Sequence, residues 1–214
     1  INPDDIVRDY GADTLRLYEM FMGDFQSAAP WSMNSVRGCK RFLDRVWRLQ
    51  NTVVDGDAYR PELESSFHKT IRKVSEDIES LKFNTAIAAM MSLLNEIEAV
   101  GSINKKEYRD LLVMLNPFAP HITEELFEEM GFGSPITSQS WVTYDPEKCV
   151  DATVEIAVQL SGKVRARIQV PADIEAADAI ALAKADPKIA SAIEGKTIVK
   201  EIYVKGKLVN IVVK

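Results

Sequence analysis

The chain has 214 residues, of which 46% are hydrophobic, and a formal net charge of −6. This length and composition fit one or two domains with hydrophobic cores of their own. The sequence holds no run of eighteen apolar residues and no cationic, apolar leader, so we expect a cytoplasmic protein with no membrane partner. Cys39 and Cys149 have no second Cys or His at ligand spacing, which predicts reduced thiols rather than a zinc site or a disulfide framework.

The first residues of the chain predict two short helices. Asn2 is a typical N-cap, Pro3 suits the first helical position, and Gly11 favours the end of the helix. The apolar residues that follow recur at mixed three- and four-residue spacing, which predicts a second helix wedged between other elements. They are Leu15, Leu17, Tyr18, Phe21 and Met22.

Four to five longer amphipathic helices follow, because apolar residues recur at three- and four-residue spacing between short breaks. Helices joined by short connections are typical of a bundle. The last of them is expected within PFAPHITEELFEEMGF and ends at Gly131. The others are expected from Ser32 to about Val54, from Glu62 to about Leu81, from Asn84 to Val100 and from Lys105 to Asn116.

Residues 134–150 lose the helical period and are predicted to be a linker. Beyond them the apolar period switches to two, over residues 154–160 and again over residues 164–170, which predicts a hairpin. The remaining pattern predicts a helix from Glu175 to Ala185, a short helix from Pro187 and a hairpin from Ile198 to Val213. Residues 151–214 are therefore predicted to form a small α+β domain of the order β-β-α-α-β-β.

No catalytic constellation is visible in the sequence. It contains no GxGxxG or Walker loop and no HExxH or CxxC motif. We therefore predict no catalytic residue, no metal site and no cofactor within this chain. His121 follows Pro120 at a predicted helix N-terminus, which favours a structural role over that of a ligand or base. The nearby acids are predicted to be a solvated face rather than a metal site; they are Glu124, Glu125, Glu128 and Glu129.

Four arginines recur at spacings of four, four and three residues on the helix predicted from Ser32, so they line one of its sides. Such a row fits either a solvated face paired with acids such as Asp44 or a set of contacts to phosphates. The candidates for phosphate contacts are Arg41 and Arg45, then Arg37 and Arg48, with Lys40 flanking the row.

A second basic row alternates with small and apolar residues on one predicted strand, so its cations are expected on one face of that strand. It consists of Lys163, Arg165 and Arg167. The row fits phosphate contacts, or an exposed strand face whose charge prevents edge pairing. Lys200, Lys205 and Lys207 are secondary candidates, because the alternation there does not indicate which face is buried.

Affinity for a nucleic acid rests on neutralising phosphates with Lys and Arg. For a chain of net charge −6, binding therefore depends on how the charge is distributed along the sequence. The whole chain has 26 Lys and Arg against 32 Asp and Glu. Residues 151–214 hold ten of those cations and eight of the acids, which leaves sixteen cations and twenty-four acids in residues 1–150. The basic charge is local rather than global.

Several segments resemble one family. GADTLRLYEMFMG and the PWS downstream of it resemble the stretch after the KMSKS loop in class I aminoacyl-tRNA synthetases, most of all in bacterial-type leucyl-tRNA synthetases. RGCKRFLDRVWRLQ and LNPFAPHITEELFEEM are similar to the first and the late bundle helices of that family. VQLSGKVRARIQVP and KEIYVKGKLVNIVVK resemble its C-terminal domain. DFQSAA departs from it, because an extended loop with Pro or acids is more usual there.

The resemblance implies a C-terminal fragment that starts just after the KMSKS loop, a mostly α-helical bundle followed by a small α+β domain. Residues 1–30 would be a hinge after the catalytic domain. Residues 31–133 would be the bundle in the position of the anticodon-binding domain. Residues 134–150 would be the linker, and residues 151–214 the C-terminal tRNA-binding domain.

The resemblance also implies a function, that of holding tRNA(Leu) for leucylation. The reaction would be carried out, with ATP and Mg, by catalytic and editing domains absent from this sequence. In that family the first bundle helix lies along the inner side of the tRNA, and the C-terminal domain contacts its corner and long variable arm. The alternatives are the equivalent region of an isoleucyl- or valyl-type synthetase, a helical protein-interaction module without RNA binding, and a self-contained enzyme of unrecognised type.

Overall fold

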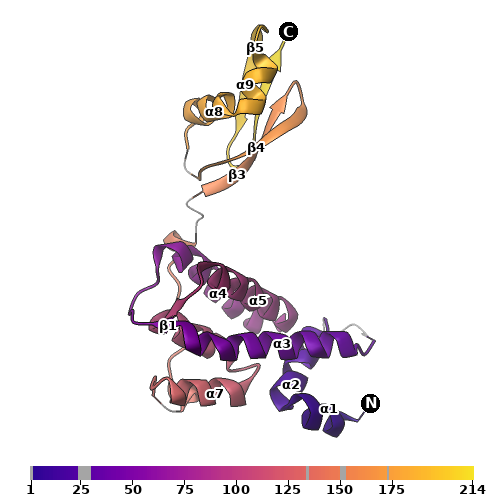
Figure 1. The fold of residues 1–214 in the computed structure, drawn as a ribbon, viewed down its shortest axis with the longest axis vertical. Coiled ribbons are helices and arrows are strands. Elements are labelled where there is room, and N and C mark those ends of the chain that lie inside the picture. Colours follow the sequence, from indigo (N-terminus) through magenta and orange to yellow (C-terminus); the bar gives the residue numbers. More distant parts are fainter. Residues whose placement is uncertain (1, 24–29, 134, 150–152, 173) are drawn as a thin grey trace. The chain divides into compact units, whose positions relative to one another are not determined.

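The computed structural model describes residues 2–23, 30–133, 135–149, 153–172 and 174–214. The chain divides into two compact units, Ile1–Cys149 and Val150–Lys214, and each is described by itself (Figure 1). The first unit is helical and the second is mixed, which confirms the predicted fold class. No helix in the described part of the chain has the length and apolarity needed to span a membrane.

The described part of the first unit consists of α-helices with two very short strands and three 3-10 segments. Its helices are α1 (Pro3–Tyr10), α2 (Ala12–Phe21), α3 (Met33–Leu49), α4 (Pro61–Glu79), α5 (Phe83–Val100), α6 (Lys105–Leu115) and α7 (Pro120–Glu129). Its other elements are the strands β1 (Val53–Val54) and β2 (Ile103–Asn104) and the 3-10 segments Gln50–Thr52, Ile136–Ser138 and Pro146–Lys148.

The helices α1 and α2 pack into the same hydrophobic core as the longer helices. Leu17 and Tyr18 of α2 are buried, and the Tyr18 hydroxyl accepts a hydrogen bond of 2.8 Å from the backbone N–H of Ser32. The described part of the expected hinge, residues 1–30, therefore belongs to the bundle. The segment DFQSAA, residues 24–29, lies outside the described residues.

The helix α3 ends at Leu49 rather than near Val54. Val53 and Val54 instead pair in parallel with Ile103 and Asn104, which suits β-branched side chains better than a helix. Because β1 follows α3 and β2 follows α5, the parallel pairing brings the carboxyl ends of these two helices together. The pairing joins segments about fifty residues apart in the sequence, which helical periodicity does not reveal.

The segment predicted as a linker, residues 134–150, is part of the first unit over its described residues 135–149. Ile136 and Val142 belong to the hydrophobic core of the bundle. Three further contacts fasten the segment to α4: Trp141 Nε1 donates to Ser75 Oγ at 2.8 Å, the backbone N–H of Asp145 donates to His68 Nδ1 at 3.0 Å, and Lys148 Nζ pairs with Glu64 at 2.6 Å. The linker prediction is wrong here, because these long-range contacts fix a segment that has no period of its own.

The contact to His68 makes the stability of the first unit depend on pH. Burial of the ring lowers the pKa of His68, and the positive charge of Lys148 lowers it further. Since the ordinary value is about 6.5, the unfolded chain binds the proton more readily than the folded one, and stability falls as the pH drops through 6.5. Above that pH the neutral ring accepts the Asp145 N–H in full.

Substitution of His68 by Asn is expected to remove this dependence. The amide oxygen of Asn accepts the Asp145 N–H without titrating. Urea unfolding at pH 7.5 and pH 5.5 measures the effect. We expect the wild type to lose about 1 kcal/mol more than the His68→Asn variant between these pH values. Equal losses in both proteins would contradict a titrating role for His68.

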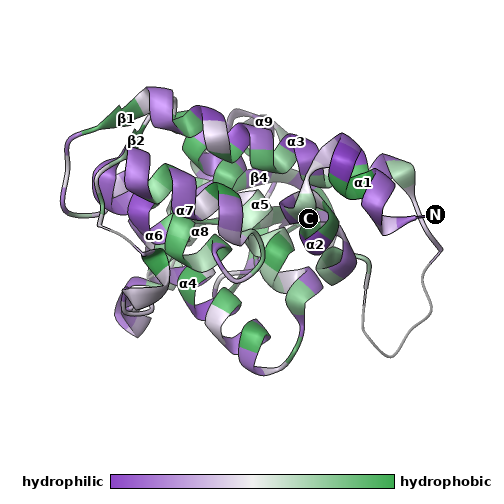
Figure 2. Cartoon of the chain, turned by 90° about the horizontal axis from the view of Figure 1, so that it is seen from below, coloured by the Kyte–Doolittle hydropathy of each residue, from purple (hydrophilic) through white to green (hydrophobic). Residues whose placement is uncertain are grey.

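The core of the first unit is formed by the apolar faces of its helices. Figure 2 shows hydrophilic and hydrophobic residues alternating along them, as amphipathic helices require. The largest fully buried side chains are aromatic, and aromatic side chains bury a large apolar area per residue. They are Tyr18, Phe67, Tyr108, Phe118 and Phe127.

The second unit is a four-stranded sheet with two helices, in the predicted order of elements. Its strands lie in the order β4-β3-β6-β5, with the two hairpins joined by a parallel pairing of β3 with β6. Both helices pack against the sheet face that carries Ile156, Val158, Val209 and Ile211. The elements are β3 (Thr153–Leu160), β4 (Lys163–Pro171), α8 (Ala176–Ala185), α9 (Pro187–Ile193), β5 (Ile198–Val204) and β6 (Leu208–Val213).

Candidate nucleic-acid interface

The predicted basic row of the first unit lies along one side of α3. The opposite side carries the buried residues Val36, Phe42 and Val46, so the arginines face away from the core. Arg37, Arg41 and Arg48 are exposed, whereas Arg45 is only partly so. The helical spacing therefore located the row correctly, but its members differ in what they contact.

Arg45, one of the two preferred candidates, is held by α5. Its Nε donates to Glu98 Oε1 at 3.0 Å, and its Nη2 donates to Glu98 Oε2 at 2.7 Å and to Asn95 Oδ1 at 2.6 Å. The hydrogen bonds between Arg45 and Glu98 raise the pKa of Arg45 and lower the pKa of Glu98 from their ordinary values. Glu98 neutralises the charge of Arg45, so Arg45 offers a phosphate less net charge than an unpaired arginine would.

The other cations of α3 also differ in whether an acid neutralises their charge. Lys40 forms an ion pair with Asp44 one helical turn away, and Arg37 donates to Asn34 Oδ1 at a long 3.4 Å. Among the described residues, neither Arg41 nor Arg48 has an ion-pair partner. Asn34 is a neutral amide, so Arg37, Arg41 and Arg48 are the cations of this row whose charge no described acid neutralises.

The basic row of the second unit is interrupted by a register shift in the β3–β4 hairpin. Ala157 pairs with Arg167 and Val158 with Ala166, but Gln159 pairs with Val164, so Arg165 has no cross-strand partner. A bulge of this kind reverses the alternation of faces beyond it. As a result, Lys163 lies opposite Leu160 rather than on the face of Arg167, and the prediction that all three cations share one face is wrong.

The cations of this hairpin are nevertheless exposed. Arg167 forms an ion pair of 2.8 Å with Glu155 on the neighbouring strand. Arg165 has no such partner among the described residues, which makes it the counterpart of Arg41 in the second unit.

The secondary candidates of the second unit, Lys200, Lys205 and Lys207, are all exposed. Lys200 lies on the edge strand β5 opposite Val212, and the other two lie at the turn between β5 and β6. Glu201 lies opposite the buried Ile211, on the side of the helices, and pairs there with Lys184 of α8. The face of β5 away from the helices thus carries Lys200.

The acidic and histidine residues in the first unit make structural contacts. Asp13 of α2 accepts hydrogen bonds from the backbone N–H groups of His121 at 3.3 Å and Ile122 at 2.7 Å, and its Oδ1 lies 2.7 Å from His121 Nδ1. Glu124 accepts the backbone N–H of Ile136 at 3.0 Å. In the described part of the chain, no group of three His, Cys, Asp or Glu residues could hold a metal ion.

Neither cysteine forms a disulfide; both are buried free thiols. Burial raises the pKa of the Cys39 thiol to about 11, so that thiol is protonated at neutral pH. A protonated, buried thiol is a poor nucleophile, and Cys39 acts as a small apolar residue between α3 and its neighbours.

Comparison with known proteins shows the family to which this chain belongs. Residues 61–181, more than half of the chain, match the family described as the anticodon-binding domain of tRNA ligase. The chain belongs to this family. The match to the anticodon-binding domain begins at α4 and extends into α8 of the second unit, so α3 lies outside it.

The whole chain of this family member also aligns with the leucine–tRNA ligase of Alkaliphilus oremlandii (strain OhILAs), with 52% identity over 214 residues. The chain spans 27% of the length of that ligase. It is also similar to the crystal structure of the ternary complex of Agrobacterium radiobacter K84 agnB2 LeuRS, tRNA and LeuAMS, with a TM-score of 0.79 and 26% identity. That match covers 100% of this chain and 30% of the other. The resemblance to leucyl-tRNA synthetases is confirmed.

Proposed function

We propose that this chain is the tRNA-binding part of a leucine–tRNA ligase and holds tRNA(Leu) while other domains carry out ATP-dependent leucylation. The observation that carries the proposal is the alignment of the entire chain with a leucine–tRNA ligase at 52% identity. The similarity to a LeuRS structure that was solved with tRNA supports it. Binding the tRNA body fixes the position of its acceptor end, which is catalysis by positioning.

The exposed cations without ion-pair partners supply the contacts in this proposal. Arg37, Arg41 and Arg48 on α3 and Arg165 on β4 offer planar guanidinium groups that match phosphate geometry. Lys200, Lys205 and Lys207 add positive charge to the second unit. Lys40 and Arg167, whose charges are neutralised by Asp44 and Glu155, contribute less.

The remaining parts of the reaction are assigned to domains outside this chain. We infer that catalytic and editing domains of the same ligase bind ATP and Mg and form the bond to leucine. The described residues contain no cluster that fits a metal ion, so no step of the reaction is attributed to them. A cytoplasmic location follows from the proposed role in protein synthesis.

Binding of the purified chain to tRNA across a salt series tests the proposal. We expect the affinity for tRNA(Leu) to fall steeply with salt, and to exceed that for a tRNA with a short variable arm. Equal affinity for both tRNAs would show that the chain binds RNA without a preference for tRNA(Leu). Absence of binding at low salt would contradict the proposal and favour a protein-interaction module.

Two matched pairs of substitutions locate the contacts. Arg41→Ala is expected to weaken binding about tenfold and to lower the salt slope by about one phosphate contact, whereas Lys40→Ala on the same helix changes little. Arg165→Ala and Arg167→Ala form the corresponding pair in the second unit. Equal effects within each pair would show that existing ion pairs do not determine which cations bind the tRNA.

A further inference from the structure

A pocket of 210 Å³ opens in the first unit where the carboxyl ends of α3 and α5 meet. Two of its lining residues, Leu49 and Ile97, are buried and give it an apolar floor. Gly101 ends α5 in the left-handed region, with φ of 84°, and a Cβ on it would meet no atom within 4 Å. The rim at Gly101 is therefore open.

One wall of the pocket is a set of fixed charges. Glu98 and Asn95 hold the guanidinium of Arg45 through three hydrogen bonds that involve its Nε and Nη2. Arg48 lines the same wall, and its positive charge lowers the pKa of Glu98. Arg45 and Arg48 carry two positive charges and Glu98 carries one negative charge, so this wall has a net positive charge. It lies toward the carboxyl end of the exposed side of α3 that carries Arg41.

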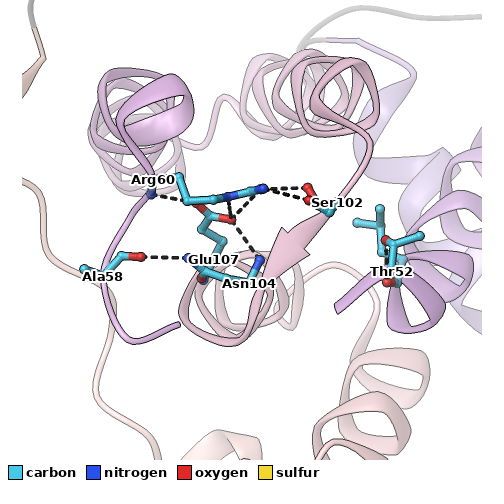
Figure 3. Close-up of polar contacts among 7 residues, drawn as sticks. Thr52, Ala58, Arg60, Ser102, Asn104 and Glu107 are labelled. Carbon is cyan, nitrogen blue, oxygen red and sulfur yellow. Dashed lines mark hydrogen bonds and ion pairs between the residues drawn. The ribbon is translucent and has the colours of Figure 1, made fainter. Parts of the chain in front are cut away.

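Thr52 and Ser102 also line the pocket, and each carries a hydroxyl group. Arg60 Nη1 donates to Ser102 Oγ at 2.8 Å and Arg60 Nη2 donates to the Ser102 carbonyl at 2.7 Å, while the buried Glu107 holds Arg60 in turn (Figure 3). Thr52 Oγ1 donates to the Leu49 carbonyl at 2.9 Å. Both hydroxyl oxygens are therefore held in place by the fold.

These bonds determine what the two hydroxyls offer to a ligand. Ser102 Oγ already accepts a hydrogen bond, and its own hydrogen has no acceptor among the described residues, so it is available as a donor. Thr52 Oγ1 already donates, so its lone pairs are available as acceptors. The two residues thus carry one available donor and one available acceptor, which is the pattern that the edge of a nucleobase complements.

We propose that this pocket binds a single unstacked nucleobase of the tRNA, with the adjoining phosphate on Arg48. The inference deepens the proposed function and rests on it. Unpaired bases splay out from RNA, stack on guanidinium planes and bond through their edges. A volume of 210 Å³ is smaller than the ~300–1,000 Å³ typical of sites for drug-sized ligands, and it suits one base rather than a base pair.

Titration of the isotope-labelled chain with AMP, GMP, CMP and UMP, followed by NMR, tests the pocket directly. We expect at least one of these nucleotides to shift the backbone amide signals of Thr52, Gly101 and Ser102 at millimolar concentration. Inorganic phosphate should shift only signals near Arg48. Identical shifts from phosphate and from every nucleotide, or no shift at the three amides, would overturn base binding.

Variants then connect the pocket to the tRNA. Thr52→Val keeps the shape of the side chain but removes the acceptor, and it is expected to weaken both nucleotide and tRNA binding about two- to tenfold. Arg48→Ala is expected to weaken both about tenfold. The matched control Arg37→Ala lies on the same face of α3 but outside the pocket, and should leave the nucleotide shifts unchanged.

The outcomes separate this inference from the proposed function. Salt-dependent tRNA binding that Thr52→Val leaves unchanged, with no nucleotide shifts, would overturn the pocket and keep the proposed function. Failure of the chain to bind any tRNA, with nucleotide shifts intact, would overturn the proposed function and, with it, the assignment of the pocket to a base of the tRNA.

Discussion

Replacement of Glu107 by Ala is expected to destabilise the first unit by about 3–5 kcal/mol, because it leaves a partly buried arginine without its counter-charge. Glu107 is fully buried, and it accepts hydrogen bonds from the backbone N–H and the guanidinium of Arg60 and from the backbone N–H of Asn104 (Figure 3). The last of these is half of a capping box that begins α6. One substitution therefore removes an ion pair and a helix cap together.

Urea unfolding followed by tryptophan fluorescence measures this effect, because all three tryptophans, Trp31, Trp47 and Trp141, lie in the first unit. The transition then reports that unit alone. Glu64→Ala is the matched control: it removes the exposed partner of Lys148 and is expected to cost less than about 1 kcal/mol. A cost for Glu107→Ala no larger than that of the control would contradict the assigned role of the network.

The double variant Arg60→Met with Glu107→Leu refines the interpretation. Apolar residues of similar size remove both charges at once, although the backbone N–H groups of Arg60 and Asn104 still lose their acceptor. We expect the double variant to recover part of the stability that Glu107→Ala loses. The Arg60 network also holds Ser102, so the double variant should weaken nucleotide binding in the pocket even where stability recovers.

Asp13→Ala is expected to cost about 2–3 kcal/mol, because Asp13 supplies the N-cap that α7 lacks in its own sequence. The residue before α7, Ala119, has no side chain that can cap, and Pro120 follows it. Asp13 reaches across from α2 and accepts two backbone N–H groups at the start of α7, while only 8% of the residue is exposed. The variant leaves both donors without a partner.

The same fluorescence assay measures this loss, and hydrogen exchange locates it. We expect the amides at the start of α7 to exchange faster in Asp13→Ala, while those of α4 change little. His121→Ala is the control, because the His121 side chain is 74% exposed and its contact with Asp13 contributes little to stability. If the two variants lose the same stability, the backbone cap is not the source of the effect.

The sequence by itself determined the long helices of the first unit, the two hairpins and two helices of the second unit, and the order of these elements. Helical periodicity located the long helices of the first unit, and the change to a period of two located both hairpins of the second. Caps are local signals: Asn2 caps α1 as predicted, and Ser32, where the next long helix was expected to begin, caps α3. These features depend on residues within a few positions of one another, so one chain is enough to reveal them.

The candidate site was only partly visible in the sequence. The spacing of Arg37, Arg41, Arg45 and Arg48 correctly placed the row on the outer side of α3. It did not reveal that Glu98, 53 residues away, neutralises Arg45. Thr52 and Ser102 carry no sequence signal at all, because their roles depend on the meeting of two helix ends.

Only the tertiary structure showed that residues 135–149 are fixed to the bundle, where the register of β4 shifts, and which cations have ion-pair partners. Residues 135–149 lack a period, yet contacts to Glu64, His68 and Ser75 of α4 fix them. The bulge at Arg165 shifts the face of Lys163 although the alternation in the sequence is perfect. The physical reason is common to all three: a charge or a strand edge is paired by whatever the fold brings near it, and that partner is distant in the sequence.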